Sequence, residues 1–284
     1  MKKQICFVLD WYPTKVNNGC VFAKHLISAI ADKGYDCVVI APRIAQRSAL
    51  RKVNRAPYKR EEMTRNGGKI RIFMPYYVHL SSHKAVMAKS MNSHYHAVMK
   101  TIRRENLKPD VVYGHFIYQC GLTAARVGEA LGVPAYCACG ENSLRLERGS
   151  RPYETGLLYC GWREILMKLT GIVCVSDNNE KLLRENGFID HAVKTGVFPN
   201  AVDGTKFHPM DKQACRKKLG LPETAFITAY TGTFSSNKGV DRLSEALRSC
   251  ENVYSLFMGQ GALEPEGEGI LFKDVFPMTT WRCT

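Results

Sequence analysis

The feature that most constrains this fold is a regular alternation of two patterns along the chain. Short apolar runs rich in β-branched residues predict strands, and amphipathic stretches with helical spacing lie between them. The expected strands are residues 4–9, 37–41, 70–74, 110–115, 135–139, 172–176 and 194–198. The clearest expected helices are residues 21–33, with Phe22, Leu26 and Ile30 on one face, and 84–105, 122–131 and 165–169. Near-continuous apolar strands separated by helices predict a parallel sheet covered on both faces, a doubly wound α/β domain spanning residues 1–195.

A second, shorter cycle of the same pattern follows. Residues 199–209 are rich in turn formers and contain Pro199 and Pro209, as expected of a connection between domains. After a helix ending at Gly220 come expected strands at 225–230, 253–258 and 270–276, with a helix at 239–248. We therefore expect a second domain over residues 196–284, too short to repeat the first and with one side of its sheet unfinished.

Composition places the chain among globular proteins. Of its 284 residues 45% are apolar and 23% charged, near the averages for folded domains. No apolar run approaches the roughly 18 residues of a membrane span. The apolar part of the N-terminus ends at Asp10, before it reaches the length of a signal-peptide core. These features predict a cytoplasmic protein.

The eleven cysteines do not form a metal or disulfide pattern. Their number is odd and most of them lie in apolar runs, as buried structural cysteines do. Cys137 and Cys139 have no second pair at zinc-ligand spacing, and His94 and His96 point apart on a helix. No metal site is predicted.

Basic residues outnumber acidic ones by 40 to 26, and one segment without any acidic residue, residues 43–60, concentrates them. Its cations are Arg43, Arg47, Arg51, Lys52, Arg55, Lys59 and Arg60. The segment is either a solvated loop or a contact for anionic lipid headgroups, nucleotide phosphates or nucleic acid. Nucleic acid is the least favoured partner, because no nucleic-acid-binding motif accompanies the charge.

Two loops have the position and composition of phosphate-binding loops. Each follows an expected strand and opens a helix, where free N–H groups and the helix dipole favour anions. The first ends with Asn18-Gly19, which lets the backbone approach a phosphate closely, or is an ordinary turn. The second contains Gly232 at a strand end and Lys238, whose flexible ammonium suits a diphosphate. Neither loop has the Gly-x-Gly-x-x-Gly pattern of nicotinamide dinucleotide sites or the P-loop pattern.

These motifs together resemble the family 4 glycosyltransferases, which have two Rossmann-like domains (the GT-B fold). The resemblance covers nearly the whole chain. The matching stretches are Asn18-Gly19 with residues 21–33 and 34–40, 109–115, 130–134, 172–176, 198–203, 207–209 and 230–243. The most specific are Phe-Pro-Asn-Ala-Val-Asp at 198–203 and Tyr-Thr-Gly-Thr-Phe followed by Lys-Gly at 238–239.

The resemblance implies transfer of a sugar from a nucleotide-diphosphate donor to a glycan or lipid-linked glycan in surface-polysaccharide synthesis. The first domain would bind the acceptor and the second the donor. Carried over by position, Asn18, Gly19 and Gly232 would approach the donor phosphates and Lys238 would neutralise them. No metal and no cofactor beyond the nucleotide sugar would take part. The basic segment would contact lipid phosphates at the cytoplasmic face of the membrane.

Two further residues receive catalytic roles from the resemblance. His115, at the carboxyl end of an expected strand, would lie near the acceptor or the reacting sugar, or be an ordinary strand-end histidine. Glu141 stands near a position where the family often has His-Gly, and would take a polar role there or cap the following helix.

The chain also departs from the family. Thr233 replaces an arginine that often follows the glycine at position 232. The family's two donor-binding glutamates would lie beyond residue 284, and residues 277–284 read like a shifted reading frame of the usual His-Asp continuation. We therefore expect a truncated glycosyltransferase sequence, a hypothesis that sequencing the downstream DNA tests. The alternatives are an inactive remnant or binding-only domain, prone to self-association through its unfinished sheet, and a Rossmann oxidoreductase, which the absent glycine motif disfavours.

Overall fold

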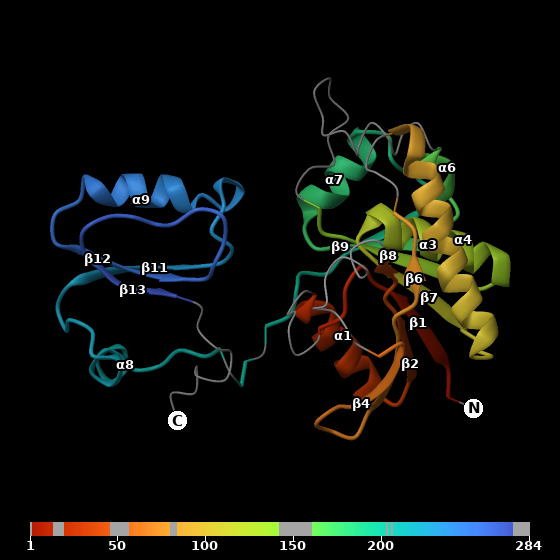
Figure 1. The fold of residues 1–284 in the computed structure, drawn as a ribbon, viewed down its shortest axis with the longest axis horizontal. Coiled ribbons are helices and arrows are strands. Elements are labelled where there is room, and N and C mark those ends of the chain that lie inside the picture. Colours follow the sequence, from red (N-terminus) through yellow and green to blue (C-terminus); the bar gives the residue numbers. More distant parts are fainter. Residues whose placement is uncertain are drawn as a thin grey trace. The chain divides into compact units, whose positions relative to one another are not determined.

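The structure is a computed structural model that describes residues 2–13, 20–45, 57–79, 84–141, 161–202, 204–205 and 207–274 (Figure 1). The chain divides into two compact units, Met1–Asn200 and Ala201–Thr284. The division falls slightly later than residue 195, where the sequence predicted it. The reason is that the strand Lys194–Val197 pairs with Gly171–Cys174 in the first sheet and holds the chain there.

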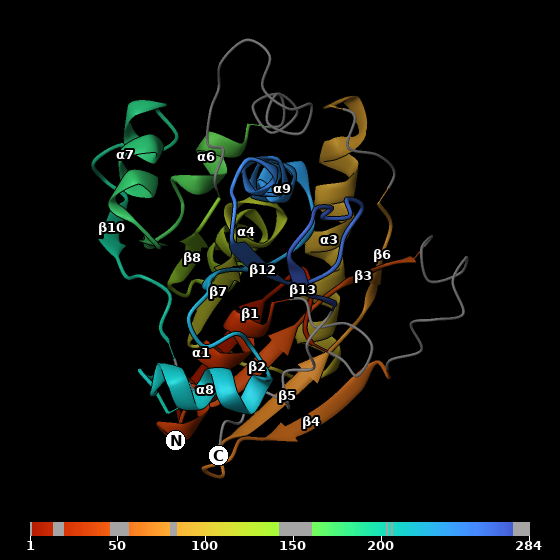
Figure 2. The same cartoon turned by 90° about the vertical axis from the view of Figure 1, so that its left-hand side faces the viewer.

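The first unit is built on one eight-stranded sheet. Its strands are β1 Gln4–Val8, β2 Asp36–Ile40, β4 Lys59–Met63, β5 Lys69–Phe73, β7 Val111–His115, β8 Ala135–Cys139, β9 Gly171–Cys174 and β10 Lys194–Val197. Their order is β10-β9-β8-β7-β1-β2-β5-β4. Figure 2 shows β10 at the left of this sheet and β4 at the lower right. All seven predicted strands are present and parallel. A separate pair, β3 Arg43–Ile44 and β6 Tyr76–Tyr77, lies outside this sheet.

The helices of this unit cover both faces of the sheet. They are α1 Val21–Asp32, α3 Lys84–Arg104, α4 Leu122–Leu131, α6 Trp162–Leu166 and α7 Asp177–Glu185. Successive side chains of β1 point to opposite faces of the sheet. Cys6 and Val8 pack with α3 and α4, whereas Phe7 and Leu9 pack with α1. The doubly wound α/β prediction is confirmed.

The face of helix α1 that packs on the sheet is not the face that carries its largest apolar residues. Ala23, Ile27 and Ala31 are buried against the sheet, while Phe22 and Leu26 are about two-fifths exposed, at 42% and 40%. Small residues let the helix approach the strands closely. The larger Phe22 instead faces His115 at the carboxyl edge of the sheet, with the two ring centroids 5.0 Å apart.

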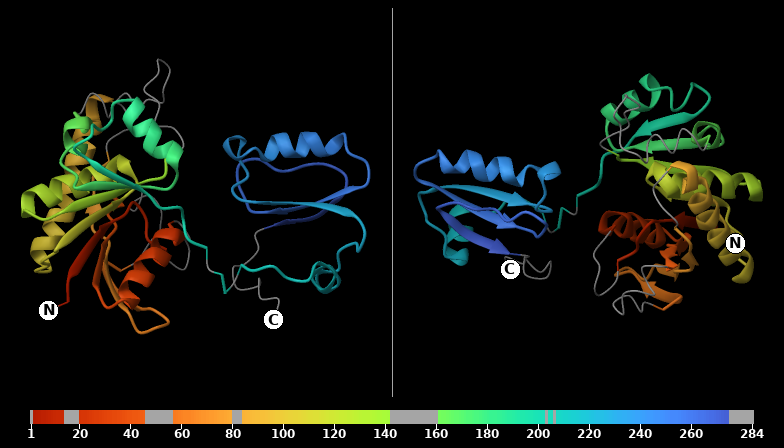
Figure 3. Two further views of the ribbon diagram at one scale, coloured as in Figure 1. Left: turned by 180° about the vertical axis from the view of Figure 1, so that it is seen from behind. Right: turned by 45° about the horizontal axis from the view of Figure 1, so that its top comes forward.

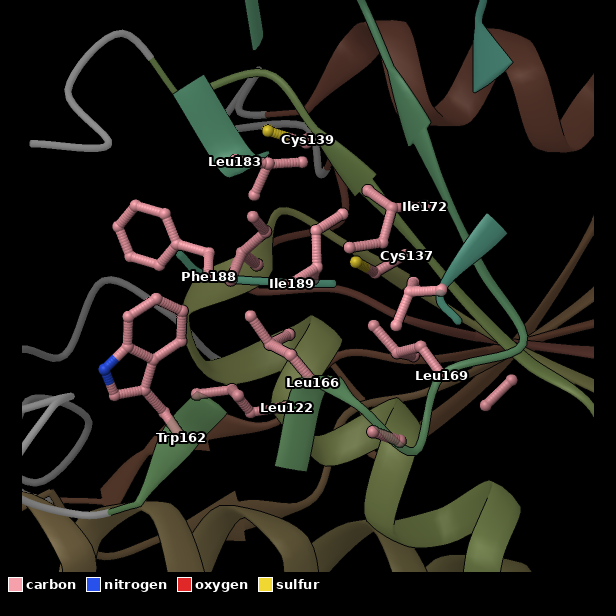
Figure 4. Packing of buried hydrophobic residues seen from close by; sticks show 14 of the residues in the cluster. Leu122, Cys137, Cys139, Trp162, Leu166, Leu169, Ile172, Leu183, Phe188 and Ile189 are labelled. Atoms are coloured by element: carbon pink, nitrogen blue, oxygen red, sulfur yellow. The ribbon is translucent and has the colours of Figure 1, made fainter. Parts of the chain in front are cut away.

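A third cluster fills the space beneath β8 and β9 (Figure 4). Trp162 on α6 packs on Phe188, with ring centroids 4.3 Å apart, and Leu166 is fully buried beside them. Cys137, Cys139 and Cys174 lie in the same cluster. The described cysteines are all free, and most are buried, as the sequence predicted.

Part of the basic segment forms a strand and internal contacts of the first unit. The sequence did not predict β4, an edge strand antiparallel to β5, because its Lys-Arg-Glu-Glu-Met sequence has few apolar residues. Lys59 in this strand pairs with Glu105, 3.2 Å away. Arg43 is only 9% exposed. Its guanidinium donates to the Met74 carbonyl through Nη2 at 3.0 Å and lies over the Tyr76 ring.

Arg43 is therefore bound within the fold and not presented to a membrane. The other cations predicted to contact membrane or acceptor lie outside the described residues: Arg47, Arg51, Lys52 and Arg55.

The second unit contains a three-stranded parallel sheet with one helix along a face (Figures 1 and 3). Its elements are α8 Lys212–Leu219, β11 Phe226–Thr231, α9 Val240–Arg248, β12 Val253–Met258 and β13 Ile270–Asp274, with the strands in the order β11-β12-β13. Phe234, Val240 and Phe257 form its small core. All three predicted strands of this domain are present. Among the described residues of either unit, no helix is long and apolar enough to cross a membrane.

Candidate functional site

The carboxyl ends of β1 and β7 mark the position where ligands bind in sheets of this type. From β1 the chain first adds β2 and β5 on one side and then returns to place β7 on the other. Such a switch point leaves a crevice outside the strand ends, because the two connecting segments depart in opposite directions. Asp10 follows β1 in this region, and His115 is the last residue of β7.

Asp10 is an ionisable group that sequence analysis did not select. Its Oδ1 accepts a hydrogen bond from the Cys120 thiol at 3.1 Å. Burial raises the pKa of Asp10 to about 6; the thiol hydrogen bond opposes this shift and the charge of Glu141 adds to it. The carboxyl group is thus set to exchange a proton near neutral pH.

His115 lies among aromatic rings. Its ring centroid is 5.0 Å from that of Phe22 and 4.8 Å from that of Phe116. Burial lowers the pKa of His115 to about 4, so the imidazole is neutral at physiological pH. A neutral imidazole between rings suits hydrogen bonding to a sugar hydroxyl and does not suit charge pairing with a diphosphate.

Glu141 follows β8 and holds the segment after β7. Its Oε1 accepts a hydrogen bond from the Ile117 N–H at 2.5 Å, and its Oε2 accepts one from the Gly140 N–H at 2.9 Å. Burial raises the pKa of Glu141, and the backbone donors oppose that shift. The carboxylate is therefore an anchor for the backbone beside His115, so its polar role is one of positioning.

The anchored segment carries backbone strain. Phe116 has φ 71° and Gln119 has φ 62°, conformations that side-chain-bearing residues seldom adopt. The segment also folds tightly onto β7, since a Cβ at Gly114 would stand 2.4 Å from the Cys120 carbonyl oxygen. Tyr77 supports it from the other side by donating to Gln119 Oε1 at 3.2 Å. Strain of this kind concentrates at functional sites.

In the second unit, two glycine loops touch at the carboxyl ends of their strands. A Cβ at Gly259 would stand 1.8 Å from the Gly232 carbonyl oxygen, and one at Gly261 would stand 2.0 Å from the Phe234 carbonyl oxygen. The Gly232 N–H also donates to the Met258 carbonyl at 3.0 Å. Only glycine at positions 259 and 261 permits this backbone contact, so these two positions after β12 carry no side chain.

Lys238 follows the loop of Gly232 along the chain, as the last residue of the short turn Ser236–Lys238 before α9. It is exposed, and Gly239, the residue that precedes α9, has φ 75°. An exposed ammonium next to a helix N-terminus suits an anionic ligand. The structure thus brings Gly232 and Lys238 into one loop region, and His115 and Glu141 to neighbouring strand ends of the first sheet. Asn18 and Gly19 lie outside the described residues.

Sequence reasoning missed Asp10, Phe22 and Cys120 at the first edge. The available signal for Asp10 was its place directly after a predicted strand. Phe22 and Cys120 had no such signal, because their proximity depends on the helix rotation of α1 and on the bent segment after His115.

Comparisons with known proteins were made on both sequence and structure. No family model matches the chain. A putative teichuronic acid biosynthesis glycosyltransferase, TuaC of Bacillus subtilis, is 24% identical over 270 residues, covering 91% of this chain and 66% of TuaC. A D-inositol 3-phosphate glycosyltransferase of Stackebrandtia nassauensis is 27% identical over 154 residues, covering 51% of this chain and 34% of that protein.

Among solved structures, sucrose-phosphate synthase from Thermosynechococcus elongatus matches with a TM-score of 0.67 at 15% identity, over 94% of this chain and 65% of its own. Anabaena HepE, solved in complex with UDP, matches with a TM-score of 0.60 at 14% identity, over 93% of this chain and 62% of its own. The chain thus spans slightly less than two thirds of the length of TuaC and of these two solved structures, and about a third of the inositol phosphate glycosyltransferase. Together the comparisons confirm what the motifs indicated: the chain is similar to glycosyltransferases and has their GT-B fold of Rossmann-like α/β domains.

Proposed function

We propose that this chain transfers a sugar from a nucleoside-diphosphate sugar to a hydroxyl group of a glycan or lipid-linked glycan during surface-polysaccharide synthesis. The name of TuaC, a putative teichuronic acid biosynthesis glycosyltransferase, supports the acceptor class. The structures of HepE with UDP and with UDP-glucose support a uridine nucleotide as the donor.

The observation that carries the donor assignment is the contact between Gly232 and Gly259. A Cβ at Gly259 would stand 1.8 Å from the Gly232 carbonyl oxygen, so the two loops meet backbone to backbone and carry no side chain at these two positions. An anionic ligand can come close to the backbone there. Lys238 adds a positive charge at the same edge. In this proposal the departing diphosphate is stabilised by these groups without a metal or other cofactor. A contribution from Asn18 and Gly19 is implied by the family resemblance alone.

On the acceptor side, His115 and the rings of Phe22 and Phe116 form the wall against which a sugar packs. Aromatic rings bury the apolar face of a pyranose, and the neutral imidazole exchanges hydrogen bonds with its hydroxyl groups. Phe22 fits this role because it is 42% exposed although it contacts the buried His115. Glu141 keeps the backbone beside His115 in place.

Membrane contact belongs to the same proposal. A lipid-linked acceptor at the cytoplasmic face would place the chain on an anionic surface, where Arg47, Arg51, Lys52 and Arg55 interact with headgroup phosphates. Reversing these four charges should abolish flotation with vesicles that contain phosphatidylglycerol, whereas Lys212→Glu on α8 should not. Undiminished flotation of the reversed variant would contradict the contact.

The test of function is the release of UDP from a panel of UDP-sugars, with ADP- and GDP-sugars alongside, in the presence of lipid extract or glycan acceptors. Transfer or slow donor hydrolysis with one nucleotide class supports the proposal. Tight nucleotide binding without turnover would favour the alternative of a binding-only domain. Binding of NADH in preference to UDP would favour an oxidoreductase and contradict the donor assignment.

A further inference from the structure

Three metal-ligating side chains from distant parts of the sequence converge at the carboxyl edge of the first sheet. Asp10 follows β1, His94 lies on α3, and Cys120 lies in the bent segment after β7. Their ligand atoms, a carboxylate oxygen, a ring nitrogen and a sulfur, all lie within 4.8 Å of one another. This upper limit includes the separation of roughly 3–4 Å between neighbouring ligands of one tetrahedral metal ion, since each bond to the ion is about 2.0–2.3 Å long.

His94 carries a nitrogen that nothing in the described fold satisfies. The residue is 1% exposed. Its Nδ1 forms a hydrogen bond with the Thr123 hydroxyl at 2.8 Å, whereas its Nε2 is buried and has no hydrogen-bond partner among the described residues. A buried, unpaired ring nitrogen is unfavourable and calls for a ligand. The Thr123 contact also fits a metal-binding histidine, because it fixes the orientation of the ring. With the proton on Nδ1, the Nε2 lone pair is free to bind an ion.

Asp10 and Cys120 supply the charge that such an ion needs. The Cys120 thiol donates to Asp10 Oδ1 at 3.1 Å. On binding, that thiol proton would pass to solvent and the thiolate, the carboxylate and the neutral imidazole would each bond to the ion. One thiolate and one carboxylate balance a divalent cation, so the occupied site has no net charge, which a buried position requires.

We propose that Asp10, His94 and Cys120 form a zinc site. Zinc binds nitrogen, sulfur and oxygen ligands together in tetrahedral geometry, whereas magnesium and calcium take oxygen ligands and seldom accept a thiolate. Three protein ligands leave a fourth position for water. The site is independent of the proposed sugar transfer and differs from the sequence prediction, which found no metal pattern because its three residues are far apart in the chain.

The first test is the metal content of the full chain. Protein purified from zinc-supplemented cultures and passed over a desalting column should retain about one equivalent of zinc by mass spectrometry of the element. Stripped protein titrated with Co²⁺ should develop a thiolate-to-cobalt charge-transfer band in the near ultraviolet, with visible bands of tetrahedral intensity. A chain that holds no zinc and gives no cobalt–thiolate band would overturn the proposal.

Variants identify the ligands. Cys120→Ser should abolish the charge-transfer band, while Cys6→Ser, which alters another buried cysteine in the same unit, should leave it unchanged. His94→Gln and the isosteric Asp10→Asn should weaken Co²⁺ binding by at least tenfold. The exposed-residue control His25→Asn should have no effect.

Two checks keep the outcome decisive. Circular dichroism establishes that each variant is folded, and if Cys120→Ser is not, the Asp10→Asn result decides. Cys174→Ser tests the other cysteine cluster, around Cys139. A cobalt band that survives in Cys120→Ser, or that disappears only in Cys174→Ser, would place the metal elsewhere and overturn the assignment.

Discussion

Glu141 holds the backbone of Ile117: its Oε1 accepts the Ile117 N–H at 2.5 Å, and its Oε2 accepts the Gly140 N–H at 2.9 Å. One carboxylate therefore joins the end of β8 to the strained segment that follows β7. The side chain that the sequence marked for a polar role in the site acts by fixing the position of its neighbours.

Glu141→Gln should lower the free energy of unfolding by about 2 kcal/mol, the value of hydrogen bonds to a charged acceptor. An amide has only one acceptor atom, so its NH₂ group would face a backbone donor. Urea denaturation measures the loss. Glu129→Gln is the matched control, since the exposed Glu129 pairs with Lys168 at the surface and its substitution should change stability by no more than about 0.5 kcal/mol. Equal effects of the two substitutions would contradict the anchoring role.

The buried His115 makes stability depend on pH. Its pKa is lowered from 6.5 to about 4, so the unfolded chain takes up a proton between these values while the folded chain does not. Above pH 6.5, His115 therefore does not change the free energy of unfolding. As pH falls from 6.5 to 4, protonation of this residue in the unfolded chain lowers that free energy. The loss amounts to about 3 kcal/mol at pH 4.

His115→Asn should remove that dependence. Between pH 7 and pH 4, the wild-type chain should lose about 3 kcal/mol more unfolding free energy than the variant in urea titrations. The exposed-histidine variant His208→Asn should follow the wild type. Parallel curves for wild type and His115→Asn would show that the imidazole is not held neutral by the fold.

Phe22→Ala should separate binding from stability. Because Phe22 is 42% exposed, its removal should change unfolding free energy by no more than about 1 kcal/mol. The loss of its ring beside His115 should still raise the KM for the acceptor several-fold while leaving UDP affinity unchanged. A variant with wild-type acceptor KM would remove Phe22 from the acceptor site.

The strand pattern could be read from the sequence because buried parallel strands need continuous apolar runs, and each run between residues 4 and 198 became a strand of the sheet. The strand β4 was missed for the opposite reason: Lys59–Met63 is an edge strand whose charged residues find partners at the surface, as Lys59 does with Glu105.

The sites were less accessible to sequence reasoning. Glycine loops after strands have a recognisable local pattern, and both Gly232 and Lys238 lie in the connection between β11 and α9, where their role in binding phosphate stays a prediction. The face of α1 that packs on the sheet could not be predicted, because Ala23 and Ile27 form one apolar face and Phe22 and Leu26 form another. Which of these two faces is buried depends on how closely the helix approaches the sheet. The proximity of Asp10, His94 and Cys120 depends on the tertiary fold alone.

The glycine contact in the second unit predicts an intolerant position. Gly259→Ala would place a Cβ 1.8 Å from the Gly232 carbonyl oxygen, so one of the two loops must move. We expect a loss of more than about 3 kcal/mol in the stability of this unit and the loss of measurable UDP binding.

Gly204→Ala is the control for that substitution, because a Cβ at Gly204 meets nothing within 4 Å. It should change stability by no more than about 0.5 kcal/mol. If a folded Gly259→Ala chain bound UDP as tightly as the wild type, the glycine contact would not be part of the donor site.

The central claim is that the loop containing Gly232 and Lys238 binds the diphosphate of a nucleotide sugar, and calorimetric titration of the full chain with UDP tests it directly. Removing a charged hydrogen bond to phosphate costs about 1.5–3 kcal/mol. The account therefore predicts that UDP binds and that Lys238→Ala weakens binding roughly 10- to 100-fold, while Lys212→Ala on α8 leaves the Kd unchanged. Absence of UDP binding, or equal affinity of wild type and Lys238→Ala, would contradict the account.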